Sequence, residues 1–306
     1  MNRTLIFAES VLLAEQLLTL AGTLGDPVHT VAIDESVAAT LAACAQDEVI
    51  LLQGASARPE DYARLLADLA RELGTSLLLV SDTVSGRELA ARTAAHLDAG
   101  LVSGAREVRR VPDGLETTRV MYAGGAVKKE ALRGLAVVTV PAGVFPPATP
   151  SLEIPLPVRR NAVEADVRVR VLDNSPIERK TAGLDSSRIV VGVGLGFDRR
   201  DDLKLAEDLA ASLHAAIGCT RPVAEDKRWL PSELYIGISG ENIQPDLYIA
   251  VGISGQVQHL AGVRDAKTIV AINKEASAPI FKAADYGIVG DLYQVLPLLT
   301  QAIKGR

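Results

Sequence analysis

The residues that could do chemistry gather after an apolar run near the carboxyl end of the chain. Residues 247–251 have the composition of a buried strand, and residues 252–255 form a turn of glycine and serine. A polar helix start at 256–259 follows, and then a second apolar strand at 268–272 ends in Asn273. Continuous apolar strands are typical of parallel sheets covered on both faces, so the turn is expected at a carboxyl edge. Glycines allow close backbone approach and helix-start amides favour anions, which predicts a nucleotide site.

Two more glycine turns precede this stretch. Gly194 and Gly196 follow an apolar strand at 189–193 as GxGxG, because Phe197 stands where the last glycine of GxGxxG would be. Residues 234–240 nearly repeat the turn at 252–255. The sequence contains no nucleophile elbow, no HExxH and no carboxylate pair with a clear partner. Glycines, hydroxyls and amides at strand ends indicate cofactor binding and not covalent or acid–base catalysis.

Arg221 is the sharpest single candidate for a charged group in such a site. It stands between Thr220 and Pro222 at a strand terminus, a position expected to keep its side chain out of solvent. The plainer alternative, considered less favourable, is a surface ion pair with Glu225 or Asp226.

The stretch 247–273 is similar to the signature of the electron transfer flavoprotein α subunit. It contains LYIAVGISGQVQHLAG and then IVAIN, and the likeness continues through 278–281 and 284–289 while weakening toward the amino terminus. So many residue types at matching spacing are far more specific than a bare GxGxxG. The resemblance implies an FAD-dependent electron carrier, not a stand-alone enzyme. It implies a heterodimer with a β subunit that holds AMP, or a second FAD in members that bifurcate electrons.

The resemblance also implies which residues bind FAD. They are Gly194, Gly196, Thr220, Arg221, Ile236, Gly237, Ile238, Ser239, Gly252, Ser254, Gly255, Gln256, Val257, Gln258, His259, Asn273, Asp291 and Leu292. It places Arg221 against the flavin ring, where a cation about 4 Å away would raise a one-electron potential by roughly 170 mV at an effective dielectric of 20.

Four other residues have an implied role beside a plainer alternative. His259 is expected near a ring carbonyl, but it could be a satisfied core histidine. Ser239 is expected near the redox nitrogen, but it could cap a turn. Asn273 and Asp291 are expected near the adenosine half, but they could form a strand-end turn and a helix cap.

Two residues depart from the family pattern. Leu195 stands where many members have arginine, so the pyrophosphate would lose a charged partner. Backbone amides are expected to remain there, and Arg199, Arg200 or Lys204 could compensate. Ile238 stands where many relatives have glutamine, which removes one side-chain hydrogen bond near the flavin.

The resemblance implies an acyl-CoA or other dehydrogenase as electron donor, and a quinone oxidoreductase or ferredoxin-type protein as acceptor. A bifurcating, NADH-dependent complex with the β subunit is the alternative within the family. Two alternatives lie outside it. One is an NAD(P)-binding oxidoreductase domain. It is disfavoured because the sequence lacks a proper GxGxxG with an acidic residue about twenty positions beyond it. The other is a nucleotide-sensing module without activity.

The elements that must position these residues alternate along the whole chain. Strands are predicted at 5–8, 28–33, 49–52, 76–80, 100–102 and 135–140, and helices at 10–20, 61–73 and 85–97, the last with a Ser85–Glu88 capping box. This alternation predicts an α/β fold of two domains, each a mainly parallel sheet with flanking helices, of the Rossmann-like nucleotide-binding kind. The domains are expected at 1–183, which would form the β-subunit interface, and at 184–306, which would bind FAD.

Several connecting segments carry their own predictions. An antiparallel excursion is expected at 106–121, and an alternating strand at 163–171 is either an arm toward a partner or a wrap over its own domain. A polar hinge is predicted at 179–187. In the second domain helices are expected at 202–217, stopped by Gly218, and at 291–303 with Asp291 as a cap.

Composition excludes several other classes. The 306 residues suit two α/β domains, and a net charge of −6 with a pI near 5.4 argues against nucleic acid as a partner. Cys44 and Cys219 are far apart and lack metal-ligand spacing, which favours a reducing cytoplasm over a disulfide framework. Glu9 and Glu15 interrupt any signal-peptide core, so a soluble cytoplasmic protein is expected.

Overall fold

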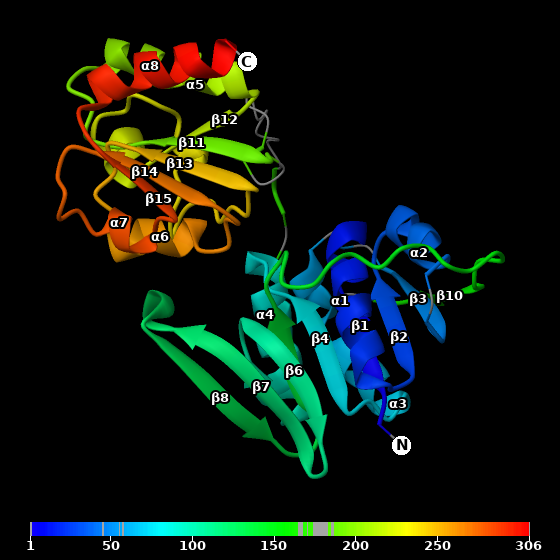
Figure 1. Cartoon of the computed structure of the whole chain (residues 1–306). Coiled ribbons are helices and arrows are strands. Elements are labelled where there is room, and N and C mark those ends of the chain that lie inside the picture. Colours follow the sequence, from blue (N-terminus) through cyan, green and yellow to red (C-terminus); the bar gives the residue numbers. More distant parts are fainter. Residues whose placement is uncertain are drawn as a thin grey trace. The chain divides into compact units, whose positions relative to one another are not determined.

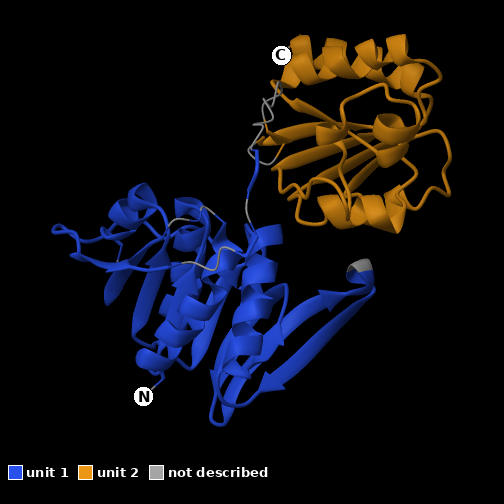
Figure 2. Ribbon diagram, turned by 180° about the vertical axis from the view of Figure 1, so that it is seen from behind, with its two compact units in different colours: residues 1–174 blue, residues 175–306 orange. Residues whose placement is uncertain are grey.

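The computed structural model describes residues 2–44, 46–54, 56, 58–164, 168–169, 171–173, 183–184 and 187–305. The chain forms two compact units, residues 1–174 and 175–306 (Figure 1, Figure 2). The predicted hinge at 179–187 lies mostly outside the described residues, and the boundary at 183/184 stays a prediction. The α/β class is confirmed, because each unit has a parallel sheet with helices against it.

Unit 1 is built on a seven-stranded parallel sheet in the order β10-β3-β2-β1-β4-β9-β5. Its strands are β1 (Thr4–Phe7), β2 (Val28–Ala32), β3 (Glu48–Gln53), β4 (Leu77–Ser81), β5 (Gly100–Val102), β9 (Ala136–Val140) and β10 (Val158–Ala162). Its helices are α1 (Val11–Leu24), α2 (Glu35–Leu41), α3 (Ala63–Glu72) and α4 (Val84–Leu97), with short turns η1 (Pro59–Tyr62) and η2 (Tyr122–Gly124). Strands β1, β2, β4 and β9 are buried along their whole length, which is why their apolar runs predicted them.

The sequence reading missed α2 and misplaced one cap. Helix α2 is short, and the Asp34 side chain caps it by accepting from the amides of Ser36 and Val37. At α4 the predicted Ser85–Glu88 capping box is wrong. Thr83 is the N-cap, and its Oγ1 accepts from the Gly86 amide at 2.8 Å.

The antiparallel excursion is confirmed, and it is longer than predicted. Strands β6 (Ala105–Val111), β7 (Gly114–Met121) and β8 (Ala126–Leu132) form a separate antiparallel sheet. Tyr122 and Val127 near its β7–β8 turn expose 82% and 63% of their surfaces.

The proline-rich segment after β9 wraps over its own unit. The amides of Ser151 and Leu152 donate to the carbonyl of Ala43, and β10 pairs in parallel with β3. The strand predicted at 163–171 is wrong where the structure describes it, because the strand ends at Ala162. Residues 165–167 and 170 lie outside the described part.

Unit 2 is a five-stranded parallel sheet in the order β12-β11-β13-β14-β15. Its strands are β11 (Ile189–Val193), β12 (Ala216–Cys219), β13 (Leu247–Val251), β14 (Ile269–Asn273) and β15 (Tyr286–Val289). Its helices are α5 (Lys204–Leu213), α6 (Val257–Val263), α7 (Ile280–Ala283) and α8 (Leu292–Lys304), with the short elements η4 (Arg200–Leu203), η5 (Pro222–Asp226) and η6 (Ser232–Leu234). Helices α5 and α8 cover one face, and α6 and α7 cover the other (Figure 1).

The helix predicted at 202–217 is wrong at its carboxyl end. It stops at Leu213 because His214 adopts a left-handed conformation with φ 52°. The following residues form β12, so Gly218 lies inside a strand and does not stop a helix. The cap at Asp291 is confirmed, since its Oδ1 accepts from the Tyr293 amide at 2.9 Å.

The strand order of unit 2 reverses around β11. The chain runs from β11 to β12 on one side and then returns to β13 on the other side. The carboxyl ends of β11 and β13 therefore form a topological switch point, which is where open α/β sheets bind their ligands.

Candidate functional site

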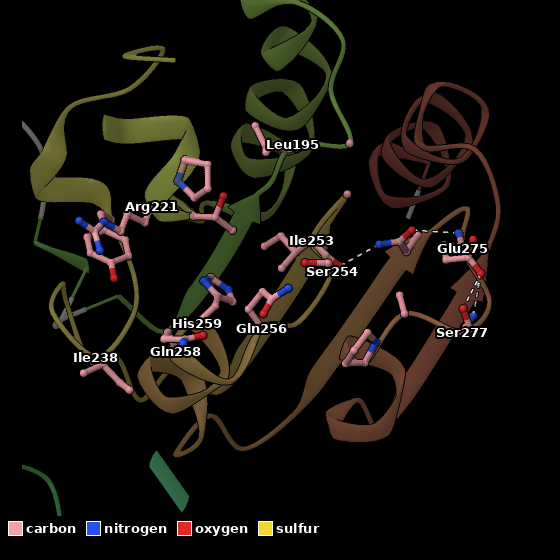
Figure 3. Close-up of a pocket in the computed structure, with 18 of the residues that line it drawn as sticks. Leu195, Arg221, Ile238, Ile253, Ser254, Gln256, Gln258, His259, Glu275 and Ser277 are labelled. Carbon is pink, nitrogen blue, oxygen red and sulfur yellow. Dashed lines mark hydrogen bonds between the residues drawn. The ribbon is translucent and has the colours of Figure 1, made fainter. Parts of the chain in front are cut away.

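A cavity of about 670 Å³ opens at this carboxyl edge of unit 2 (Figure 3). It is lined by Leu195, Gly196, Thr220, Arg221, Pro222, Tyr235, Ile238, Ser239, Gly252, Ile253, Ser254, Gln256, Gln258, His259, Asn273, Glu275, Ser277, Ala278 and Pro279. The lining comes from the loops after β11, β12, β13 and β14 and from the turn after η6. Parallel strands bring these loops together although the sequence separates them.

The glycines of the GxGxG motif allow the turn after β11 to pack closely against the turn after β13. A Cβ on Gly194 would lie 2.3 Å from the carbonyl oxygen of Gly252, and one on Gly196 would lie 2.5 Å from its Cα. The amides of Gly194 and Gly196 donate to the carbonyls of Val251 and Gly252 at 3.0 and 2.9 Å. These two amides are occupied, so the expectation that the motif's amides remain for a pyrophosphate is wrong at both glycines.

The turn after β13 needs glycine for two reasons. Gly252 and Gly255 have positive φ angles of 60° and 84°. A Cβ on Gly255 would also lie 2.3 Å from the backbone nitrogen of Ile280. The turn thereby exposes Ser254 at the cavity while Gly255 stays buried against α7.

His259 lines the cavity as a buried, fully hydrogen-bonded residue. Its exposed fraction is 6%; Nε2 is 2.8 Å from the hydroxyl of Tyr248, and Nδ1 is 3.1 Å from the carbonyl oxygen of Ile236. Burial lowers the pKa of His259 to about 4. At neutral pH the ring is uncharged, as in the plainer alternative of a satisfied core histidine.

Arg221 lines the cavity but is not held out of solvent. Its side chain is 63% exposed, and its Nε donates to Glu225 Oε2 at 2.6 Å. This hydrogen bond and the charge of Glu225 raise the pKa of Arg221. The surface ion pair with Glu225, the less favoured alternative, is therefore the one observed. It offsets part of the positive charge that Arg221 brings to the cavity.

Thr220 offers an unsatisfied hydroxyl at the same edge. Its Oγ1 is buried and has no hydrogen-bond partner among the described residues. Ser239 lies across the turn after η6, with its Oγ 3.2 Å from the hydroxyl of Tyr235. Ile238 is 52% exposed at the cavity, and its amide donates to the carbonyl of Gln258 at 2.9 Å.

A chain of hydrogen bonds links the lining residues that follow β14 to the β13 turn (Figure 3). Asn273 donates from Nδ2 to the carbonyl of Ile253 at 2.8 Å and accepts at Oδ1 from the Glu275 amide at 2.9 Å. Glu275 in turn accepts from the amide and hydroxyl of Ser277. Asn273 thus forms the strand-end turn that was its plainer alternative, while its side chain still lines the cavity.

The structure brings most of the predicted residues to this edge. The cavity is lined by Gly196, Thr220, Arg221, Ile238, Ser239, Gly252, Ser254, Gln256, Gln258, His259 and Asn273. Asp291 and Leu292 line a smaller adjoining pocket with Gly196, Asp198, Gly252, Asn273, Lys274 and Tyr293. Neither pocket is lined by Gly194, Ile236, Gly237, Gly255 or Val257. The three glycines pack closely against neighbouring atoms, and the carbonyl oxygen of Ile236 lies 3.1 Å from His259 Nδ1.

Besides Leu195, seven lining residues were not predicted as site residues: Pro222, Tyr235, Ile253, Glu275, Ser277, Ala278 and Pro279. Ile253 lies inside the predicted turn, and 275–279 directly follow Asn273 at the end of β14. Their position after a predicted strand was the available signal, because it places them at the same sheet edge.

A parallel sheet with a partly apolar cavity at its switch point, bordered by hydroxyls and amides, defines a nucleotide-cofactor-binding α/β protein. Residues 9–169 match the electron transfer flavoprotein domain, and residues 183–264 match the electron transfer flavoprotein FAD-binding domain. The chain belongs to the electron transfer flavoprotein family, as an α subunit that binds FAD.

Two relatives from Escherichia coli match over most of their length. The chain is 41% identical over 259 residues to "Putative electron transfer flavoprotein subunit YdiR" of strain K12, covering 84% of this chain and 83% of that protein. It is 35% identical over 306 residues to Protein FixB of strain ED1a, covering 97% of each. The family normally pairs with a β subunit. Among the described residues, no helix is long and apolar enough to cross a membrane.

The residues present at the cavity fit FAD. Its volume is in the usual range for cofactor sites, and Thr220 Oγ1 supplies a buried polar group whose partner is not among the described protein atoms. Leu195, Ile238 and Ile253 give apolar surface of the kind that an aromatic ring system buries.

Proposed function

We propose that the cavity of unit 2 holds the FAD of this electron carrier, and that the residues which the family resemblance implies as FAD-binding are its contacts. The chain would then take electrons from an acyl-CoA or other dehydrogenase and deliver them to a quinone oxidoreductase or a ferredoxin-type protein. A β subunit carrying AMP or a second FAD would complete the heterodimer.

The main support for FAD in this cavity is the buried hydroxyl of Thr220, which has no hydrogen-bond partner among the described residues. A buried hydroxyl without a partner costs free energy, and a ligand that offers it a hydrogen bond recovers that cost. Thr220 follows β12, the strand next to β11, and it lines the same cavity as Arg221 and the β13 turn. A cofactor with ring carbonyls and nitrogens would satisfy it.

At the corresponding edge of unit 1, polar side chains hydrogen-bond to one another, which supports assigning FAD to unit 2. After β1 and β4, the hydroxyl of Thr83 donates to Glu9. Thr139 Oγ1, in β9, donates to Asp82 Oδ1 at 2.6 Å. These contacts occupy polar groups that a nucleotide would otherwise need.

FAD supplies the electron storage, and the residues of this chain set the conditions around it. Arg221 provides a solvent-exposed positive charge that Glu225 partly offsets, while His259 provides an uncharged ring. Leu195 and Ile238 present exposed apolar surface to the cavity.

Residues 1–183 are proposed to form the β-subunit interface. Tyr122 and Val127 at the end of the β7–β8 hairpin are exposed apolar side chains of the kind that interfaces bury. Residues 184–306 would then carry FAD as the second domain.

The test compares Thr220→Val with Thr300→Val, which changes a buried threonine on α8 outside the cavity lining. FAD is titrated into the FAD-free heterodimer and followed by quenching of flavin fluorescence. Thr220→Val is expected to weaken FAD binding about fivefold, because one net hydrogen bond is lost. The free energy of unfolding of the FAD-free protein should not fall, because the variant removes an unsatisfied group. Equal FAD affinity in Thr220→Val and wild type would contradict the proposed site.

A further inference from the structure

Unit 2 has a groove apart from the cavity at its switch point. The groove has a volume of about 620 Å³, and its walls come from η4 and from residues 224–232, which run from η5 to η6. Among the described residues, none lines both the groove and the cavity. We call it the Trp229 groove, and the residues that give it its chemistry are Arg200, Arg228, Trp229, Leu230, Pro231 and Ser232.

The positive charge of the Trp229 groove is not balanced within the protein. Among the described residues, no hydrogen bond or ion pair engages the guanidinium of Arg200 or that of Arg228. The acidic residue in the lining is Glu225, and its carboxylate already accepts from Arg221 at 2.6 Å. The groove therefore presents two uncompensated cations on a chain whose net charge is −6.

The loop that carries Arg228 is fixed by its own backbone. The amide of Lys227 donates to the carbonyl of Pro222 at 2.9 Å, and the amide of Trp229 donates to the carbonyl of Val223 at 3.0 Å. Lys227 also brings a third cation, because its Nζ lies 5.9 Å from the centre of the Trp229 ring. Trp229 itself packs against the core of unit 2. A wall held in this way loses little conformational freedom when it binds a partner.

The groove is open, which favours a segment of a protein over a small molecule. Arg200, Arg228, Pro231 and Ser232 are all exposed, whereas small-molecule sites usually bury most of their ligand. Arginine and tryptophan are the residues that most often dominate protein interfaces, and a guanidinium pairs with a carboxylate through two parallel hydrogen bonds. Because the chain as a whole is acidic, an acidic partner is attracted only where cations gather without partners.

We propose that the Trp229 groove binds a carboxylate-rich segment of a partner protein. Arg200 and Arg228 pair with its carboxylates, and Trp229 packs against the methylene groups that carry them. This inference goes beyond the proposed function and does not depend on FAD, because the groove and the cavity have separate linings.

The first test uses a hexaglutamate peptide and the fluorescence of Trp229, the only tryptophan of the chain. The peptide is titrated into the purified heterodimer at low salt, and the signal of Trp229→Phe is subtracted to remove any tryptophan of the β subunit. The emission of Trp229 is expected to change saturably with hexaglutamate and not with hexaglutamine, and binding should weaken as salt is added. No response to hexaglutamate would overturn the proposal. An equal response to inorganic phosphate at the same concentration of charge would also overturn it, because the groove would then bind single anions.

The second test asks whether the two arginines provide the attraction. Arg200→Gln and Arg228→Gln should each weaken hexaglutamate binding about threefold, and the double variant about tenfold, as expected for exposed ion pairs. Arg133→Gln is the matched control, since it removes an exposed arginine of unit 1 that likewise has no partner among the described residues. Its effect should be less than about twofold. If the control weakened binding as much as the groove variants, the attraction would be a general effect of charge, and the proposal would be wrong.

Discussion

Burial of His259 should make the stability of unit 2 depend on pH. The fold lowers the pKa of His259 from 6.5 to about 4, whereas in the unfolded chain the imidazole recovers its ordinary value. Below pH 6.5 the unfolded state binds a proton that the folded state does not, so the free energy of unfolding falls as the pH falls toward 4. For these two pKa values the loss relative to neutral pH is about 2 kcal/mol at pH 5 and about 3 kcal/mol at pH 4.

Trp229 makes this loss measurable for unit 2 by itself. It is the only tryptophan of the chain, and it packs against the core of the unit that contains His259. Urea unfolding of FAD-free protein is followed by tryptophan fluorescence at several pH values between 7 and 4, in the wild type and in His259→Gln. Carboxylates titrate in both proteins and cancel in the comparison, so the wild type should lose about 2 to 3 kcal/mol more than the variant. The same pH dependence in both proteins would refute the argument that burial keeps His259 neutral.

Two further variants test the electrostatics and the packing of the cavity. Glu225→Gln should raise the one-electron midpoint potential of bound FAD, and Arg221→Ala should lower it, each by tens of millivolts. These shifts are well below the roughly 170 mV calculated for a cation about 4 Å from the flavin at an effective dielectric of 20, because Arg221 is exposed and paired. Spectroelectrochemical titration measures both potentials, and unchanged values in both would exclude an electrostatic role for the pair. Gly194→Ala should destabilise unit 2 by about 2 kcal/mol, since its Cβ would meet the Gly252 carbonyl at 2.3 Å. Gly22→Ala is the control, because a Cβ at residue 22 would have no atom within 4 Å. Unfolding of both variants is followed by Trp229 fluorescence. If the two unfolding transitions coincided, the packing role of Gly194 would be contradicted.

The sequence by itself determined the α/β class and most of the strands. Buried parallel strands such as β4 and β13 are continuous apolar runs, and that pattern is local. Prediction from the local pattern failed where a run of residues suited both a helix and a strand. The run after Leu213 has residues that suit a helix or a strand, and the left-handed conformation of His214 that ends α5 has no glycine to announce it.

The sequence also predicted where the candidate site lies. Gly252 and Asn273 each come at or just after the end of a predicted strand, and parallel strands end at one edge of their sheet. Thr220 was placed at a strand edge, although the strand before it was predicted as the end of a helix. The spacing of the residues around Gly252 and His259 was enough to indicate the flavoprotein family, which the matches over 9–169 and 183–264 confirm.

Only the tertiary structure decided which polar atoms and charges of these residues a ligand could use. The amides of Gly194 and Gly196 already donate to the carbonyls of Val251 and Gly252. The Arg221 side chain is mostly exposed and pairs with Glu225. The two partners of His259, Tyr248 and Ile236, are 11 and 23 residues away in the chain. Desolvation and hydrogen-bond partners set the charge of a side chain, and both depend on atoms that folding gathers from distant segments, so a local pattern could name His259 but not its protonation state.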